Sequence, residues 1–250
     1  MVEMGDLREG IMPEDLTDIA LQVTRTPGAL LRGIGANFAC LAGPAPTAED
    51  MAALSSLANG TEEVCGPFVD VVAGGSSANL LWALGTGPAG RVNSLRLGEA
   101  ILLGTDPVSG NPISGLHTDA FVLQAEVIET KAKSKLAPLK LSDPALSALS
   151  LVPGNHWKTR SILAVGLQDT DPAGLTFPAA VSYIGATSDH LVVETTNCPL
   201  RIGSEIRLRV NYSALLRAMA APDVEKVICS GRHAADGRTA SRNGRHAALL

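Results

Sequence analysis

Two glycines and two serines follow a short apolar run in the first third of the chain, as Gly74-Gly75-Ser76-Ser77. Glycines let a backbone approach a ligand closely, serine hydroxyls donate hydrogen bonds, and a helix is expected to begin just beyond. These are the components of a phosphate-binding loop. An ordinary strand-to-helix turn with a serine N-cap uses the same residue types, so the segment by itself leaves both interpretations open.

Three further polar residues stand near the ends of predicted strands. Arg96 precedes a glycine and an apolar run, Asn37 closes a strand, and Arg8 lies between Asp6 and Glu9. Each has an ordinary explanation, because arginines are usually solvated, asparagine is common in turns, and Arg8 can pair with its acidic neighbours. Their position distinguishes them, since the sites of β/α barrels form where strands meet the following loops.

Residues 1–104 must position these side chains, and they alternate short apolar runs with helical segments. Helices are predicted over Met12–Val23, over Asn79–Leu84, and from an N-cap at Thr47 that precedes acidic residues. Further apolar runs are predicted strands: 29–38, 68–73 and 100–103. This alternation indicates parallel β/α units. About four strands by this pattern cannot close an eight-stranded barrel, so an incomplete TIM-type β/α barrel is expected.

The pattern changes after Gly104. Residues 105–117 are rich in Gly, Pro, Ser and Asp and are predicted to be a linker that opens a second region, 105–228. Beyond the linker, turn residues separate short β-branched runs, which are 120–131, 161–165, 181–184, 190–194 and 206–210. These runs predict an antiparallel β domain. The expected fold class is therefore α/β, a partial barrel followed by an antiparallel β domain.

Residues 229–250 differ from both regions. They consist mainly of Arg, Gly, His, Ala and Ser without an apolar period. Such a composition predicts a disordered tail.

The overall composition excludes several classes of protein. The chain has 250 residues, a net charge of -5 and 3% aromatic residues, which gives little basis for binding nucleic acid or an anionic membrane. Its apolar runs are too short to span a bilayer, and acidic residues close to Met1 do not suit a signal peptide. Four widely spaced cysteines indicate neither a disulfide framework nor a metal site. A cytoplasmic protein that binds a small molecule is expected.

Taken in order, several segments resemble the alanine racemase superfamily, the fold-type III enzymes that use pyridoxal 5′-phosphate (PLP). The segments are Gly33-Ile34-Gly35-Ala36-Asn37-Phe38, 74–79, 95–104, 164–169, 185–190 and 210–216. The likeness is greatest to a branch of predicted amino-acid racemases that includes ornithine racemase, and it covers about residues 1–228. It implies a homodimeric enzyme that interconverts L- and D-amino acids, with ornithine, another basic amino acid, alanine or serine as the substrate.

The resemblance also implies roles for individual residues. Ser76 and Ser77 would hold the phosphate together with the backbone N–H groups of Gly98 and Glu99. Arg96 would face the pyridine nitrogen. Because an arginine does not give up a proton to that nitrogen, the ring is a weaker electron sink, which favours racemisation over side reactions.

Two positions matter for the substrate side of such a site. Asn37 matches the residue beside the cofactor ring, and Arg8 loosely matches the arginine that steadies the substrate carboxylate. The Schiff-base lysine of the family should lie on the first barrel strand, upstream of Gly5, whereas every lysine here lies at Lys131 or later. We therefore expect an N-terminally truncated racemase that is inactive in this form.

Racemisation at Cα requires a base on each face of the carbon. In the family one base is the cofactor lysine, and the other is a tyrosine from the β domain of the second subunit. Leu167 occupies the place of that tyrosine and cannot move a proton. Asp169 or His190 is the candidate replacement. Each also suits a structural role, Asp169 in a turn and His190 as a hydrogen-bonded strand residue.

Three other functions remain open. A non-catalytic protein that binds and buffers PLP would share the barrel, but such family members lack a β domain. A binding module for a phosphorylated small molecule would explain the serine loop and leave the later segments unexplained. A PLP-dependent decarboxylase usually carries a catalytic cysteine and an acidic residue at the pyridine nitrogen, which Arg96 disfavours.

Overall fold

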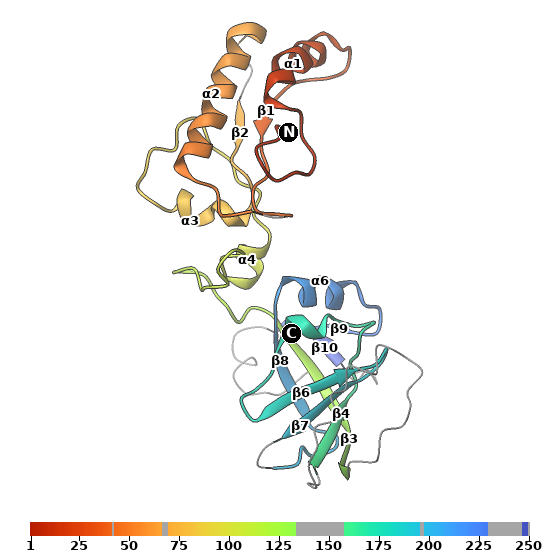
Figure 1. Ribbon diagram of the computed structural model, residues 1–250. Helices are drawn as coiled ribbons and strands as arrows, with labels where there is room; N and C mark the ends of the chain where they lie inside the picture. Colours follow the sequence, from red (N-terminus) through yellow and green to blue (C-terminus); the bar gives the residue numbers. More distant parts are fainter. Residues whose placement is uncertain (42, 67–69, 134–157, 196–197, 230–246, 250) are drawn as a thin grey trace. The chain divides into compact units, whose positions relative to one another are not determined.

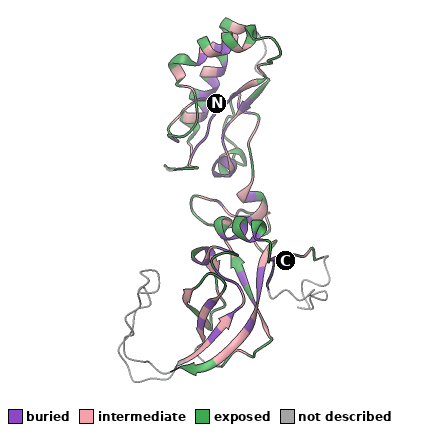
Figure 2. Ribbon diagram, turned by 90° about the vertical axis from the view of Figure 1, so that its right-hand side faces the viewer, coloured by how far each residue is buried: buried purple, intermediate pink, exposed green. Residues whose placement is uncertain are grey.

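The computed structural model describes residues 1–41, 43–66, 70–133, 158–195, 198–229 and 247–249. The chain divides into two compact units, Met1–Thr118 and Asp119–Leu250 (Figure 1). Each unit contains buried residues of its own (Figure 2). Among the described residues, no helix has both the length and the apolar character needed to cross a bilayer.

The first unit is built on short parallel strands. β1 (Gly33–Gly35) pairs in parallel with β2 (Val71–Ala73), and parallel bridges extend this pair at Val2 on one side and at Ser94 on the other. The parallel pairing that the sequence predicts is therefore present. Closure of these segments into part of a barrel stays a prediction.

Glycine allows β1 and β2 to pair closely. A Cβ atom on Gly33 would lie 1.9 Å from the carbonyl oxygen of Val71, so no side chain fits there. The predicted strand over 29–38 is observed only as β1, and Leu30 is 74% exposed ahead of it. Apolar residues such as Leu30 made the predicted strand too long, because this part of the chain is exposed and pairs with no other strand among the described residues.

Two long helices accompany these strands. A 3-10 turn, η1 (Pro13–Asp15), leads into α1 (Leu16–Arg25), and α2 (Ala48–Cys65) contacts both α1 and the strand pair. α2 begins with the predicted N-cap, because Thr47 Oγ1 accepts from the Asp50 N–H at 3.2 Å while Asp50 Oδ2 accepts from the Thr47 N–H at 2.7 Å. Its buried face packs with strand residues in one core, whose members include Met51, Leu54, Ile34 and Val72.

The predicted strand over 100–103 is wrong. η2 (Ser77–Asn79) and α3 (Leu80–Ala83) follow β2 as expected, but residues 99–103 form a helix, α4 (Glu99–Leu103). Ala100 and Leu103 are buried and Ile101 is exposed, which is a helical period that a run of four apolar residues is too short to reveal. The fourth parallel segment lies earlier, at the polar residue Ser94.

The predicted linker over 105–117 is part of the first unit. Ile113 is 3% exposed and packs with Leu80 and Ala100 in a small core, and its N–H donates to the Gly104 carbonyl at 2.8 Å. The division between the units therefore falls after Thr118 and not after Gly104. The many turn residues in this segment predicted a linker, but the buried side chain of Ile113 packs it against the first unit.

The second unit is a mainly antiparallel β domain, as the sequence predicts. Its 8-stranded sheet has the order β5-β8-β3-β4-β7-β6, and off this path β10 pairs with β3 and β9 pairs with β10. The elements are β3 (Val122–Lys133), β4 (Lys158–Leu163), η3 (Pro172–Gly174), β5 (Leu175–Thr176), β6 (Val181–Ala186), β7 (Leu191–Thr195), β8 (Glu205–Val210), α6 (Tyr212–Ala220), β9 (Glu225–Lys226) and β10 (Ala247–Leu249).

Strand β10 lies within the predicted disordered tail and differs from that expectation. Ala247, Ala248 and Leu249 are buried, and they pair antiparallel with β3 and in parallel with β9. The three residues are apolar, so burial in the sheet removes them from water. Residues 230–246 and 250 of the tail lie outside the described residues.

Candidate functional site

In the first unit, the loop after β2 is joined to the segment that leads into α4. The Arg96 N–H donates to the Gly75 carbonyl at 2.9 Å. The Ser77 hydroxyl oxygen then accepts from the N–H groups of Gly98, at 3.3 Å, and Ala100, at 3.1 Å. The serine loop and the backbone predicted to share a phosphate with it are thus brought together.

The roles of the two serines differ. Ser76 occupies the N-cap position of η2, and its side chain makes no capping hydrogen bond. Its hydroxyl contacts the thiol of Cys40, with 3.7 Å between Oγ and Sγ. Ser77 is 5% exposed, and its hydroxyl accepts from the N–H groups at the beginning of α4. Ser76 therefore does not cap the turn that follows it, whereas the contact of Ser77 with the first N–H groups of α4 is a capping contact, so the structural and the phosphate-binding interpretations both fit this segment.

Packing and backbone conformation both explain the glycines of this loop. A Cβ atom on Gly74 would lie 2.6 Å from Cγ1 of Val92, and Gly75 has a φ of +100°, which favours glycine. Asn79, which is fully buried, donates from Nδ2 to the Gly74 carbonyl at 2.7 Å. Sequence reasoning did not single out this asparagine, and only its place at the end of the Gly-Gly-Ser-Ser-Ala-Asn segment pointed to it.

The donor groups at this loop suit a phosphate. The Ser77 hydroxyl and the Glu99 N–H lie at the beginning of α4, together with the Gly98 N–H that donates to Ser77, and groups of this kind bind anions. Glu99 adds a carboxyl group at the same place. Burial, and secondarily the carboxylate of Asp106, raise the pKa of Glu99.

Arg96 is anchored through one of its nitrogens. Its Nη2 donates to the Asn37 side-chain oxygen at 2.6 Å and to the Ala36 carbonyl at 3.0 Å. Asn37 is 5% exposed, whereas Arg96 is exposed. Guanidinium has five N–H donors, so the groups on Nε and Nη1 stay available to an acceptor such as a ring nitrogen.

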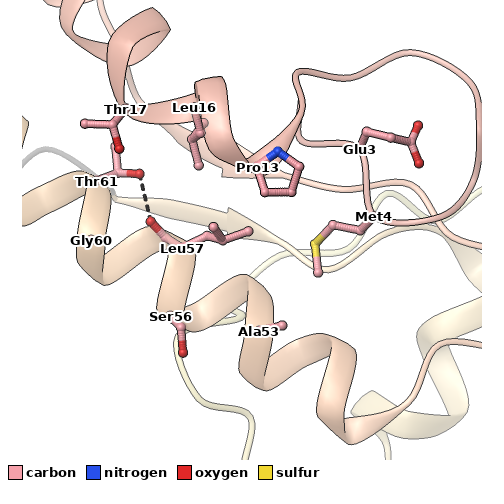
Figure 3. Close-up of a pocket in the computed structure, with 10 residues that line it drawn as sticks. All are labelled: Glu3, Met4, Pro13, Leu16, Thr17, Ala53, Ser56, Leu57, Gly60 and Thr61. Atoms are coloured by element: carbon pink, nitrogen blue, oxygen red, sulfur yellow. Dashed lines mark hydrogen bonds between the residues drawn. The ribbon is translucent and has the colours of Figure 1, made fainter.

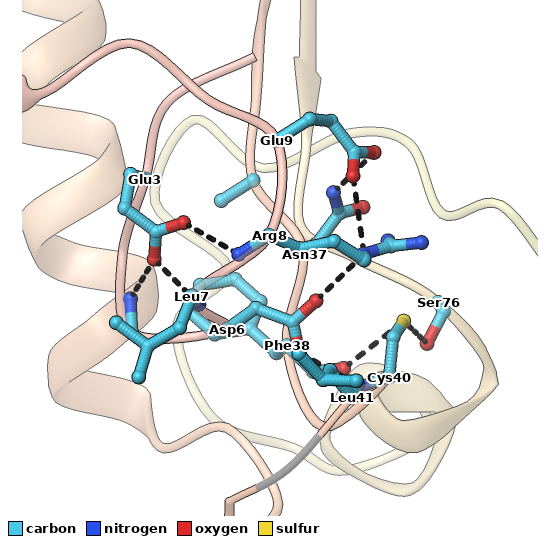
Figure 4. Close-up of polar contacts among 12 residues, drawn as sticks. Glu3, Asp6, Leu7, Arg8, Glu9, Asn37, Phe38, Cys40, Leu41 and Ser76 are labelled. Atoms are coloured by element: carbon cyan, nitrogen blue, oxygen red, sulfur yellow. Dashed lines mark hydrogen bonds and ion pairs between the residues drawn. The ribbon is translucent and has the colours of Figure 1, made fainter.

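Arg8 belongs to an acidic loop that reaches the same asparagine (Figure 4). Its Nε lies 3.1 Å from a carboxylate oxygen of Asp6 and 3.1 Å from one of Glu9. The other oxygen of Glu9 accepts from Asn37 Nδ2 at 2.8 Å. The ion pairs that the sequence offered as the ordinary explanation of Arg8 are therefore present, and they engage Nε, leaving the terminal nitrogens for a carboxylate.

Asp6 fixes the shape of this loop. Its Oδ1 accepts from the backbone N–H groups of Cys40, at 2.8 Å, and Leu41, at 3.2 Å. Burial alone would raise the pKa of Asp6, but these hydrogen bonds and the one from Arg8 outweigh it and lower the pKa. Asp6 is therefore an ionised group that joins the loop after Val2 to the loop after β1.

Asp169 and His190 lie together in the second unit. The N–H of Leu167 donates to the Thr187 carbonyl at 3.0 Å, which joins the two segments that carry them. Asp169 is 7% exposed, and its Oδ2 accepts from the Gly166 N–H at 2.8 Å. Burial is the main cause that raises the pKa of Asp169, and His190 acts in the opposite direction.

These contacts bear on the two interpretations of each residue. Asp169 makes the turn contact that a structural role requires. The backbone of His190 exchanges hydrogen bonds with Thr187, while the half-buried imidazole has no hydrogen bond among the described residues. The imidazole is thus the less committed of the two side chains.

A separate cavity of about 530 Å³ lies beside α1 and α2 (Figure 3). Its lining is mostly apolar, with Met4, Leu16 and Leu57 among the residues, and Glu3 is the one titratable side chain of the ten that line it. A site with a carboxylate and no cation in its lining does not suit an anionic ligand. The polar loops at the strand ends remain the candidate site.

Comparison with known proteins finds a family model and related racemases that match this chain. Residues 1–106 match the family model described as alanine racemase, N-terminal domain. The lysine racemase of Thermotoga maritima is 36% identical over 231 residues, which are 91% of this chain and 64% of that protein. The ornithine racemase of Acetoanaerobium sticklandii is 31% identical over 231 residues, covering 90% and 65% respectively. The chain thus spans less than two thirds of the length of these relatives.

Solved structures share the fold at low sequence identity. The alanine racemase from Streptomyces lavendulae has a TM-score of 0.61 at 17% identity, over 87% of this chain and 60% of that one. The biosynthetic alanine racemase from Pseudomonas aeruginosa has a TM-score of 0.60 at 19% identity, over 88% and 60%. The D-threonine aldolase from Filomicrobium marinum has a TM-score of 0.59 at 14% identity, over 87% and 56%. The family-model match and the two curated relatives confirm the resemblance of this chain to the alanine racemase superfamily, in the branch that includes ornithine racemase.

Proposed function

We propose that this chain supplies the cofactor site and the β domain of a PLP-dependent amino-acid racemase that acts on a basic amino acid such as lysine or ornithine. One observation carries the proposal. The loops predicted to hold the two ends of the cofactor are bonded to each other, through Arg96 N–H to Gly75 O at 2.9 Å and through the Ser77 hydroxyl to α4. Relatives named lysine and ornithine racemase support the substrate class.

Each group in these loops has a defined task in the proposal. PLP, when bound, supplies a ring that withdraws electrons and so acidifies the Cα hydrogen of an attached amino acid. The Ser77 hydroxyl hydrogen and the Glu99 N–H would bind its phosphate, and the Gly98 N–H would do so in place of its hydrogen bond to Ser77. Arg96 donates from Nε or Nη1 to the ring nitrogen and keeps its own proton. Arg8 presents its terminal nitrogens to the substrate carboxylate.

The proton at Cα needs a carrier on each face. We assign one face to the imidazole of His190, because an imidazole ring can both accept and donate a proton and this ring has no hydrogen bond among the described residues. Asp169 is the alternative, although its carboxylate already accepts from Gly166. A β domain from a second copy would deliver this residue, so the proposal includes a homodimer, in the cytoplasm.

On the other face of Cα, the proton carrier in the family is a lysine. Every lysine of this sequence lies at position 131 or later, and residues 1–106 contain none. The proposal therefore includes weak racemisation by the 250-residue chain with PLP, because the second carrier is absent from the part that matches the family model.

Exchange of the Cα hydrogen with solvent tests the proposal. This exchange needs a proton carrier on one face of the carbon only, whereas racemisation needs one on each face. The purified chain is incubated with PLP and L-lysine, L-ornithine or L-alanine in D₂O, and deuterium at Cα is measured by mass spectrometry. The expected result is exchange above the rate with free PLP, greater for the basic amino acids and lost in Arg96→Leu. Binding of PLP without faster exchange would instead support a protein that buffers the cofactor, and no binding would refute the proposal.

A further inference from the structure

Glu9 is connected to the candidate site by a hydrogen bond with Asn37. Its Oε1 accepts from Asn37 Nδ2 at 2.8 Å, and Asn37 Oδ1 accepts from Arg96 Nη2 at 2.6 Å. The asparagine amide therefore lies between a carboxylate and a guanidinium group. Glu9 and Asn37 are 28 positions apart in the sequence, and Asn37 and Arg96 are 59 apart, so the fold brings all three together.

The charges at the two ends give the amide a single favourable orientation. With its oxygen toward Arg96 and its nitrogen toward Glu9, each dipole end faces the opposite charge. A flipped amide would place N–H groups against the cation and an oxygen against the anion. Because Asn37 is 5% exposed, water can do little to replace either partner.

Glu9 is itself held in an ionised state. Hydrogen bonds from its own backbone N–H and from the Asn37 amide lower the pKa of Glu9. Its second oxygen pairs with Arg8 Nε at 3.1 Å. An exposed ion pair of this kind contributes little to stability, so the bond to the buried amide is the contact with the larger structural consequence.

We propose that Glu9 is a positioning residue that acts through Asn37 to fix the guanidinium group of Arg96 toward the cofactor ring. Arg96 is exposed, and Nη2 is its one anchored nitrogen among the described contacts. If its partner amide can turn, the direction of Nε and Nη1 is no longer fixed. The cofactor part of this inference rests on the function proposed above, while the positioning part concerns contacts of the chain itself.

Side-chain NMR of the full 250-residue chain tests the positioning part directly. In ¹⁵N-labelled protein at low temperature, a guanidinium group held by hydrogen bonds gives separate Nη signals, and Arg96→Lys identifies those of Arg96 by their loss. Glu9→Ala is expected to merge or broaden these signals. Glu9→Gln keeps an acceptor oxygen at the same reach but loses the charge and adds an N–H₂ donor, so it is expected to restore them only in part.

Two further variants make the outcome specific. Glu14→Ala removes one exposed carboxylate from the same part of the chain and is expected to leave the Arg96 signals unchanged. Asn37→Ala is expected to merge them, and Glu9→Ala is expected to add nothing in that background. Unchanged Arg96 signals in Glu9→Ala, or equal changes in Glu9→Ala and Glu14→Ala, would overturn the inference.

A parallel titration with PLP separates this inference from the proposed function. Absorbance of bound PLP gives a dissociation constant for the wild type and each variant. The expected result is weaker binding in Glu9→Ala than in Glu14→Ala. Failure of the wild type to bind PLP would refute the proposed function, whereas equal affinity of the two variants would refute the link between Glu9 and the cofactor.

Discussion

Replacing Ser77 by alanine removes the hydroxyl that joins the serine loop to α4. The oxygen accepts from Gly98 N–H at 3.3 Å and from Ala100 N–H at 3.1 Å, and Ala100 is fully buried. A hydrogen bond of this kind contributes about 0.5–1.5 kcal/mol, and a buried donor without a partner costs about 1–3 kcal/mol. The expected loss in the free energy of unfolding of the first unit is therefore about 2 kcal/mol.

Ser76→Ala is the matched control, because it removes the same atom from the neighbouring position. Among the described residues its hydroxyl has one hydrogen bond, with the thiol of Cys40 at 3.7 Å, so a change below about 0.5 kcal/mol is expected. The free energies of unfolding of the two serine variants are measured by urea denaturation, with tryptophan fluorescence as the signal. A Trp157→Phe background leaves Trp82 as the reporter, and Trp82 packs against the core of the first unit.

Equal stability of the two serine variants would refute the assignment. It would mean that the Ser77 hydroxyl does not hold the beginning of α4, and that the loop and the helix meet for another reason. A loss confined to Ser77→Ala, with an unchanged slope against urea, would place the effect on this contact and not on a wider loss of structure.

Three further substitutions test the structure elsewhere. Thr47→Ala removes the acceptor for the Asp50 N–H and is expected to cost about 1 kcal/mol in urea unfolding; no loss would contradict the capping box. Gly33→Ala places a methyl group 1.9 Å from the Val71 oxygen and is expected to cost at least about 1–3 kcal/mol, with loss of the β1–β2 amide protection in hydrogen exchange. The pKa of Asp6 is lowered by folding, so its contribution to stability is present above the unfolded pKa of about 4 and disappears as the pH falls through the folded value. Asp6→Asn should therefore flatten the pH dependence of unfolding in acid, and an unchanged profile would contradict that linkage.

The sequence predicted best those elements whose signal is local. The cap of α2 was visible as Thr-Ala-Glu-Asp, and the short strands of the β domain were visible as β-branched runs between turns. The four apolar residues at 100–103 were too few to show a period, and Ser94 is a polar residue whose strand contact comes from its neighbours in space. The structure of both segments depends on contacts with residues distant in the sequence, which a local pattern does not contain.

The candidate site shows the same limit. Ser77, Arg96 and Gly98 were singled out because an ordered set of short segments resembled a family. In the structure the Gly98 N–H donates to Ser77, and the Arg96 N–H donates to Gly75 of the same serine loop. Glu9 was visible only as a neighbour of Arg8. Its bond to Asn37 spans 28 positions and depends on the return of the chain after β1, which no local pattern encodes.

The pairing of β10 with β3 has a practical consequence for handling the protein. Ala247–Leu249 cover one edge of Leu123–Ala125, whose other edge is taken by β8. Proteolysis or an engineered deletion that removed these three residues would leave a row of open amide and carbonyl groups in the middle of the sheet. Such an edge accepts any extended peptide, so a shortened chain should self-associate, and an affinity tag is better fused at the amino end.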